Sequence, residues 1–231
     1  LLGLEALLRW PSGRVTHSTD EVIRQLESSE MIVNVGRNIL ARVCGDLATL
    51  RRQGFPGLTM SMNVSAGQLG DRGLIPAIEQ ALRRHRIPPA LFQVEITETV
   101  LMQNPEHNSR ILRKVKELGI GLAMDDFGTG YSSLAYLSYF PFDTIKIDQS
   151  LVRNDWSQRD TLLESVISMA NNLGLATVAE GVESSEDADK LEEMGCKYIQ
   201  GFVAGVPVNS EEATELVMKQ NPLVTNDDAA E

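Results

Sequence analysis

The sequence contains few cysteines, few aromatic residues and no long apolar run. Among 231 residues, Cys44 and Cys196 are the only cysteines, and aromatics make up 5%. Two cysteines without metal-ligand spacing exclude a disulfide framework, so we expect two buried thiols in a reducing cytoplasm. No stretch approaches a membrane span, and the N-terminus lacks a signal-peptide pattern. We therefore expect a soluble cytoplasmic domain, or the cytoplasmic part of a membrane-anchored protein. We also expect a fragment of a longer chain, because the sequence begins at Leu1 inside an apolar run.

Basic residues are outnumbered by acidic residues. There are 21 Lys and Arg against 32 Asp and Glu, which gives a formal net charge of −11. A balance of this sign argues against a nucleic-acid polymer as partner. The 42% hydrophobic and 23% charged residues are typical of a globular domain with a sizeable core.

Several catalytic motifs are also missing. No G-x-S-x-G elbow is present, which disfavours a serine hydrolase. The stretch GTGYSS at 128–133 lacks the G-K-[ST] of a phosphate-binding loop and the third glycine of a dinucleotide fingerprint. The three histidines, His17, His85 and His107, fall outside the strand ends discussed below, and we interpret them as surface residues.

Short apolar or β-branched runs alternate with longer helical patterns, as in βα units around a parallel sheet. The runs predict strands at 2–8, 58–64, 91–97, 120–125, 143–148, 175–179 and 197–200. The helical patterns predict helices near 20–28, 33–52, 73–86, 105–118, 159–173, 185–194 and 210–219. Gly119 and Gly174 are placed to end helices, Pro105 to begin one, and Ser184 with Asp187 resembles a capping box.

Seven βα repeats in one domain predict an α/β fold, a TIM-type (β/α)8 barrel that lacks its first strand in this chain. No linker interrupts residues 1–219, so we expect one domain there. The polar, acidic stretch 220–231 is expected to be a frayed tail.

Polar residues interrupt nearly every predicted strand, mostly at its carboxyl end. A strand buried on both faces should be almost continuously apolar, and a carboxylate there is costly unless it is paired or binds a cation. Because parallel strands end at one mouth of a barrel, these side chains should converge. An all-oxygen set suits Mg²⁺ or Mn²⁺ better than Zn²⁺. The residues are Glu5, Asn63, Glu95, Glu98, Asp125, Asp126, Lys146, Asp148, Glu180 and Gln200.

Seven motifs in register resemble the EAL-domain cyclic di-GMP phosphodiesterases of bacteria. They are EALLRW at 5–10, NVS at 63–65, EITE at 95–98, DDFGTGYSSL at 125–134, KID at 146–148, AEGVE at 179–183 and QGF at 200–202. The resemblance implies an enzyme that hydrolyses cyclic di-GMP to linear pGpG with two Mg²⁺ or Mn²⁺ ions, lowering the level of this second messenger.

The resemblance also implies roles for individual residues. The first ion would be held by Glu5, Asn63, Glu95 and Asp125, and the second by Asp125, Asp126 and Glu180. Lys146 would contact the attacking water, and Glu98 would steady the loop at 127–133. The substrate would be bound by Arg9, Gln200, Asp148 and Glu183.

The physical chemistry of Lys146 fits such a role. Beside two dications its pKa should be lowered, which would let it accept a proton or orient a water. Thr144, Lys146 and Asp148 share one strand face, which can point into the mouth. The alternative for Lys146 is a surface ion pair with Asp148.

Some features depart from the family. The strand with a Gln-Pro pair that precedes the EAL triplet is absent, and Val203 to Val206 replace an aromatic and a basic residue. Helix 20–32 is also less family-like. The alternative function is a non-catalytic cyclic di-GMP receptor or interaction module. By resemblance, the partners are cyclic di-GMP, a second copy of the chain through the 127–133 loop and the helix after it, and upstream GGDEF, PAS or receiver domains.

Overall fold

The computed structural model describes residues 1–9, 18–129, 137, 139–153 and 158–220. Among these residues, none of the helices has the length and apolar character needed to cross a membrane. The expected acidic tail falls outside the described residues except for Gln220, which ends the last helix. The predicted boundary of the domain at residue 219 stays a prediction.

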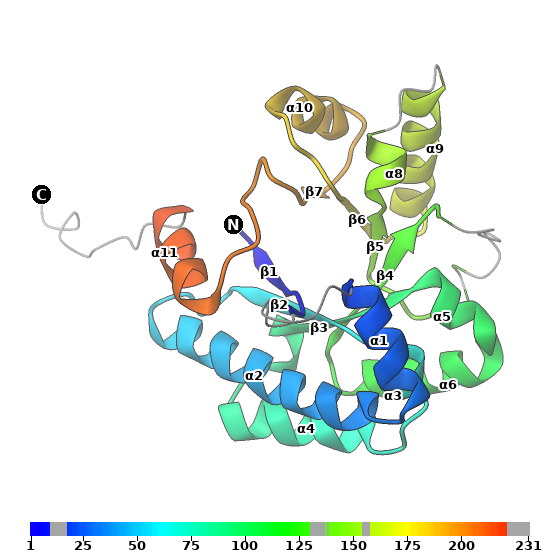
Figure 1. The fold of residues 1–231 in the computed structure, drawn as a ribbon. Helices are drawn as coiled ribbons and strands as arrows, with labels where there is room; N and C mark the ends of the chain where they lie inside the picture. Colours follow the sequence, from blue (N-terminus) through cyan, green and yellow to red (C-terminus); the bar gives the residue numbers. More distant parts are fainter. Residues whose placement is uncertain (10–17, 130–136, 138, 154–157, 221–231) are drawn as a thin grey trace, which may run out of the picture.

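Seven parallel strands form one sheet in which each strand pairs with its neighbours in the chain (Figure 1). All seven predicted strands are confirmed. Their bounds are β1 Gly3–Ala6, β2 Thr59–Asn63, β3 Phe92–Thr97, β4 Gly121–Phe127, β5 Thr144–Ile147, β6 Ala176–Ala179 and β7 Tyr198–Ile199.

The sheet curls into a half-barrel whose two edge strands are β1 and β7. Parallel strands close into a barrel when the edges pair, and in the described residues β1 and β7 do not pair. The predicted α/β fold, an incomplete TIM-type barrel, is therefore confirmed.

Helices connect the strands and cover the outside of the sheet. The predicted ones are confirmed as α1 Thr19–Ser28, α2 Ile32–Arg52, α4 Leu74–His85, α6 Pro105–Glu117, α9 Arg159–Asn172, α10 Ser185–Glu193 and α11 Ser210–Gln220. The described residues contain four additional short elements: α3 Ala66–Leu69, η1 Pro89–Leu91, α5 Glu98–Gln103 and α8 Gln149–Val152. In Figure 1, α2 and α4 lie side by side below β1, β2 and β3, whereas α8, α9 and α10 lie around β5, β6 and β7.

The predicted helix ends are largely correct. Gly119 and Gly174 follow their helices with φ of 82° and 74°, a region that costs glycine little, and Pro105 occupies the first turn of α6. At α10 the capping box is only half formed. Asp187 N–H donates to the Ser184 hydroxyl oxygen at 3.1 Å. The Asp187 carboxylate, however, accepts from that hydroxyl at 2.6 Å, whereas a capping box would have it accept from the Ser184 backbone.

The core lies between the sheet and its helices and fixes the strand register. Ile145 and Ile147 of β5 and Leu47 of α2 are fully buried in one continuous apolar cluster. Burial of each such side chain contributes about 1.5–3 kcal/mol, so the strands cannot slip without exposing the core. Cys44 and Cys196 are buried free thiols, as expected, and burial raises the pKa of Cys44 to about 11.

Candidate active site

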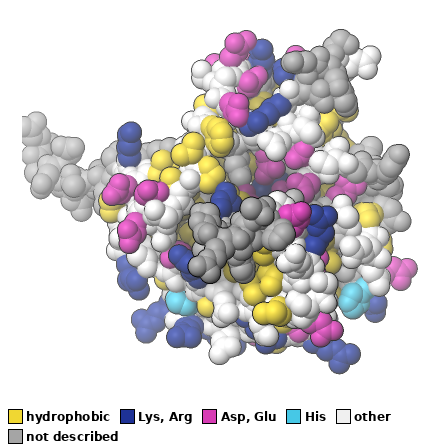
Figure 2. Space-filling model, viewed as in Figure 1, with side chains coloured by type: hydrophobic (Ala, Val, Ile, Leu, Met, Phe, Trp, Pro, Cys, Tyr) yellow, Lys and Arg dark blue, Asp and Glu magenta, His cyan; other side chains and the backbone are white. Residues whose placement is uncertain are grey.

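Carboxylates from four strand ends gather at the mouth of the half-barrel, in two overlapping groups. In the first, Glu5, Glu95 and Asp125 each offer an oxygen atom within 4.8 Å of the others. In the second, Asp125, Asp126 and Glu180 do the same. Figure 2 shows acidic side chains in the recess between the upper part of the molecule, which carries α10, and the lower part. The convergence follows from the topology, because parallel strands all end at the same side.

An irregularity in β4 allows two consecutive aspartates to serve one group. In a regular strand, successive side chains point to opposite faces. Here the register with β5 shifts between Met124 and Phe127, and Asp126 adopts a positive φ of 55°. The Asp126 carbonyl accepts from the Thr129 hydroxyl at 2.9 Å, which holds the turn. This bulge brings both carboxylates to the mouth.

Lys146 lies at the centre of the carboxylates. Its Nζ is 2.7 Å from Glu180 Oε1, 2.8 Å from Glu95 Oε2, 3.1 Å from Asp125 Oδ1 and 3.2 Å from Glu5 Oε2. Its side chain is 3% exposed, so these contacts are formed away from bulk water. The alternative of a surface ion pair with Asp148 is therefore wrong. One ammonium links both carboxylate groups.

The site shifts the pKa values of its members in opposite directions. Burial raises the pKa of Glu95 to about 7, and that of Glu180 to about 7, although the Lys146 ammonium acts against the rise in both. For Glu5, burial is outweighed by Lys146 and by hydrogen bonds from Gln200 and Asn63, so its pKa is lowered.

The pKa of Lys146 itself is raised. Burial disfavours its charge, but the four surrounding carboxylates outweigh burial. The expectation of a lowered pKa concerned Lys146 beside two bound dications and stays a prediction for that state, because the neighbours that raise the pKa here are all negative. Cations bound to the same carboxylates would reverse that balance.

Two amide side chains orient Glu5. Asn63 Nδ2 donates to Glu5 Oε1 at 2.7 Å, and Gln200 Nε2 donates to Glu5 Oε2 at 2.6 Å. Gln200 follows β7 and Glu5 belongs to β1, so this bond joins the two edges of the open sheet. Asn63 and Gln200 therefore both lie in the site, as the sequence suggested.

The other predicted residues lie outside the carboxylate groups. Glu98 is buried at the start of α5, and most of the 127–133 loop that it was predicted to steady lies outside the described residues. Arg9 is exposed and donates to the Leu8 carbonyl at 3.0 Å. Asp148 caps α8 by accepting from Ser150 N–H at 2.8 Å. Glu183 forms an ion pair with Arg153 at 2.6 Å.

Sequence reasoning missed Arg153, which donates to the Gly181 carbonyl at 2.8 Å across 28 positions of sequence. No local pattern could have linked the two. Sequence reasoning identified Lys146 as a polar residue in an apolar strand. It did not predict that the Lys146 ammonium contacts four carboxylates.

The donor set fits hard divalent cations. Every candidate ligand atom is an oxygen, and the groups share Asp125. Asp125 Oδ1 is buried and has no hydrogen-bond partner, since its contact with Lys146 has the distance of an ion pair without hydrogen-bond geometry. A buried carboxylate oxygen that accepts no hydrogen bond suits a cation ligand. Glu5, Glu95 and Asp125, with the Asn63 amide oxygen, could hold one ion, and Asp125, Asp126 and Glu180 a second.

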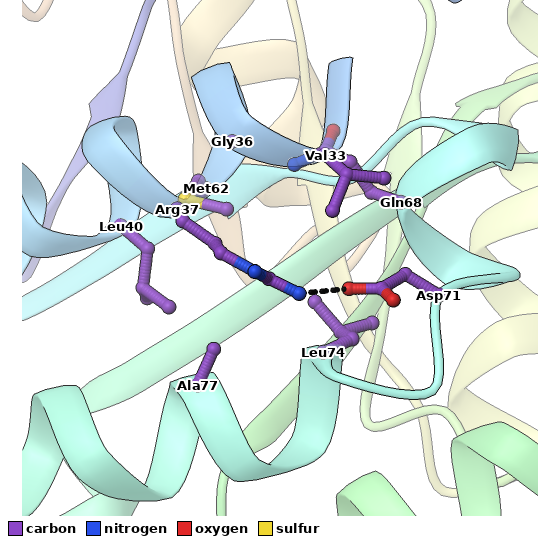
Figure 3. A pocket seen from close by; sticks show the side chains of 9 residues that line it. All are labelled: Val33, Gly36, Arg37, Leu40, Met62, Gln68, Asp71, Leu74 and Ala77. Carbon is purple, nitrogen blue, oxygen red and sulfur yellow. Dashed lines mark hydrogen bonds and ion pairs between the residues drawn. The ribbon is translucent and has the colours of Figure 1, made fainter. Parts of the chain in front are cut away.

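A cavity between α2 and α4 is a separate feature (Figure 3). It is lined by Val33, Gly36, Arg37, Leu40, Met62, Gln68, Asp71, Leu74 and Ala77. Arg37 and Asp71 form an ion pair of 2.9 Å across it, and the rest of the lining is mostly apolar. None of the predicted site residues contributes to this cavity, so it is not the candidate active site.

Comparison with known proteins identifies the family. The family model described as EAL domain matches residues 1–207. The chain belongs to the EAL domain family. It is 37% identical over 213 residues to the cyclic di-GMP phosphodiesterase NbdA of Pseudomonas aeruginosa, covering 89% of this chain and 27% of NbdA. The domain is thus homologous to cyclic di-GMP phosphodiesterases.

Solved structures of EAL domains share the fold. The PaMucR phosphodiesterase in complex with c-di-GMP has a TM-score of 0.87 and 31% identity, with 92% of this chain and 87% of that chain covered. BlrP1 of Klebsiella pneumoniae, in a calcium and cyclic di-GMP complex, has a TM-score of 0.73 and 29% identity, with 86% and 50% covered. The chain spans 26–54% of the length of eight curated relatives that it matches.

Proposed function

We propose that this EAL domain hydrolyses one phosphodiester bond of cyclic di-GMP to give linear pGpG, with two Mg²⁺ or Mn²⁺ ions. The observation that carries the proposal is the pair of carboxylate groups that share Asp125. Two-metal phosphodiester chemistry needs two closely spaced ions, and a shared carboxylate is a common way to hold them. Homology to cyclic di-GMP phosphodiesterases supports the choice of substrate.

Charge makes the cations necessary for substrate binding. The chain has a net charge of −11, and its mouth is lined by carboxylates, so the anionic dinucleotide would be repelled. Bound divalent ions supply positive charge at the phosphate and lower the pKa of a bound water.

The chain's own residues position the attacking water, the metal ligands and the substrate. Lys146 lies between the two carboxylate groups, so its ammonium can donate to a water held there and orient it for attack. Gln200 and Asn63 fix the carboxylate of Glu5. We assign Glu98 to the support of the loop after β4, and Arg9, Gln200, Asp148 and Glu183 to the substrate side.

We further propose that the domain is the output part of a longer cytoplasmic signalling protein. It spans a quarter to a half of its relatives' length, and these include a bifunctional diguanylate cyclase/phosphodiesterase, MucR, and an oxygen sensor, DosP. Upstream GGDEF, PAS or receiver domains and a homodimer would fit such a role.

The experiment is a turnover assay. The purified chain is incubated with cyclic di-GMP and Mg²⁺, Mn²⁺ or EDTA, and the nucleotides are separated by chromatography. We expect pGpG with either ion and none with EDTA. Glu95→Gln should remove activity, whereas the matched control Glu79→Gln, at a surface pair with Arg83, should not. Binding of unchanged cyclic di-GMP under all conditions would instead identify a non-catalytic receptor.

A further inference from the structure

The loop after β6 carries one of the carboxylates at the mouth. Glu180 opens this loop, and its backbone N–H donates to the Ile147 carbonyl at 3.0 Å, which ties it to β5. Its carboxylate lies among like charges, because Asp125 and Asp126 are in the same group. The Lys146 ammonium, 2.7 Å from Glu180 Oε1, offsets this repulsion at the carboxylate. The backbone that carries Glu180 is held by contacts on the two sides of the loop.

On its inner side the loop is fixed to the turn after β7. Val182 N–H donates to the Gln200 carbonyl at 3.1 Å, and the Val182 carbonyl accepts from Val203 N–H at 3.1 Å. Gly201 makes this approach feasible, because a Cβ there would lie 2.2 Å from the Val182 carbonyl oxygen. Val182 is 1% exposed, so this side of the loop is closed to solvent.

On its outer side the loop is held by Arg153, which directly follows α8. Arg153 Nε donates to the Gly181 carbonyl at 2.8 Å, and its terminal nitrogen pairs with Glu183 Oε1 at 2.6 Å. These contacts flank Val182 on both sides. Gly181 has a φ of 68°, and a Cβ there would lie 2.5 Å from the Cβ of Gln149. The loop can therefore pack closely against α8 only with glycine at 181.

We propose that Arg153 is a positioning residue that holds Glu180 in place for the second divalent ion. Arg153 contacts the Gly181 carbonyl and Glu183, and neither of these belongs to the two carboxylate groups. It acts by fixing the backbone one residue beyond Glu180. The ion pair of Arg153 with Glu183, a residue that the proposed function places near the substrate, holds the same loop two residues beyond Gly181. The inference rests on the proposed function, which assigns Glu180 to the second ion.

Removal of the Arg153 guanidinium should weaken binding of the second ion and leave global stability unchanged. Arg153 and Glu183 are 43% and 51% exposed, and pairs of this kind contribute little to global stability. Removing the guanidinium should therefore leave the fold intact while the loop relaxes. We expect affinity for the second Mn²⁺ to fall about 3- to 10-fold. This loss is smaller than the roughly 10- to 100-fold loss seen when a residue that hydrogen-bonds a metal ligand is removed, because Arg153 contacts only the backbone next to Glu180. Affinity for the first Mn²⁺ should stay unchanged.

The test is a Mn²⁺ titration of the whole chain, in which free Mn²⁺ is followed by electron paramagnetic resonance. Glu180→Gln identifies which binding step belongs to the second ion. Arg153→Met should weaken that step alone, and Arg153→Lys should fall between, because one ammonium cannot bridge both contacts as a guanidinium does. The matched control is Arg37→Met, since Arg37 is 50% exposed and pairs with Asp71 at the separate cavity (Figure 3).

The outcomes are distinguishable. Unchanged binding steps in Arg153→Met would overturn the inference while leaving the proposed function in place. Equal weakening of both steps, together with a lower melting temperature in EDTA, would also overturn it, because Arg153 would then be a general stabiliser. Failure of the unaltered chain to bind any Mn²⁺ would contradict the proposed function itself.

Discussion

Replacing Lys146 with methionine tests whether one ammonium holds the acidic mouth together without metal. The substitution keeps a long side chain and removes the charge that lies within 3.2 Å of four carboxylates. The carboxylates would then face one another without a counter-ion. We expect the metal-free protein to be strongly destabilised.

The magnitude follows from the geometry. At an effective dielectric constant of 20, each contact near 3 Å corresponds to a gross attraction of roughly 5 kcal/mol. The burial of the ammonium and the repulsion among the carboxylates offset most of this sum, and loss of one member of a buried ionic cluster costs about 3–5 kcal/mol net. At about 2–4 °C per kcal/mol for a chain of this size, the melting temperature in EDTA should fall by roughly 6–20 °C.

The assay is thermal unfolding followed by circular dichroism at pH 8, in EDTA and with Mn²⁺. Mn²⁺ should stabilise Lys146→Met more than the unaltered chain, because divalent ions replace the missing positive charge. The control is Lys116→Met, since the Lys116 to Asp143 pair is 37% and 42% exposed and should contribute about 1 kcal/mol or less. If Lys146→Met melted within about 2 °C of the unaltered chain in EDTA, the central role of Lys146 would be refuted.

Three further predictions concern activity, pH and metal identity. Glu5→Ala should lower the rate of pGpG formation by at least about 100-fold while circular dichroism shows an unchanged fold, and full activity would contradict its role as a ligand. Glu95 and Glu180 have pKa values of about 7 in the folded chain, against an ordinary value of 4.5. Protonation of these two carboxylates therefore stabilises the metal-free fold, and this contribution is complete below pH 4.5. That stability should be lost as pH rises through 7, by a few kcal/mol in urea unfolding with EDTA, and a gain between pH 5 and 8 would show the shifts to be wrong. Ca²⁺ in place of Mg²⁺ should permit cyclic di-GMP binding but slow hydrolysis in the chromatographic assay, because the larger ion tolerates irregular coordination; equal rates would count against the mechanism.

The sequence predicted the strands because they are short apolar runs, and the longer helices because their apolar residues recur with a helical period. Even β7, Tyr198–Ile199, was found from its short apolar run. The additional helices α3, α5 and α8 each span six residues or fewer, and such short segments carry no helical period. Their positions depend on packing that only the assembled sheet defines.

The carboxylates of the site were predictable for a physical reason. A parallel strand buried on both faces excludes charge, so Glu95 in FQVEIT and Asp125 in GLAMDDF stand out as exceptions. The bulge that turns Asp126 toward the mouth could not be predicted, because it depends on the shifted register between β4 and β5. The raised pKa of Lys146 in the metal-free mouth could not be predicted from the sequence, because the four carboxylates that cause it come from four different strands or strand ends.

The central claim is that two divalent ions bind at the carboxylate groups of this mouth. The most direct measurement is anomalous X-ray scattering at the manganese edge from crystals grown with Mn²⁺. We expect two peaks, one among Glu5, Asn63, Glu95 and Asp125 and one among Asp125, Asp126 and Glu180. Crystals in which these side chains diverge, with no anomalous peak between them, would contradict the account.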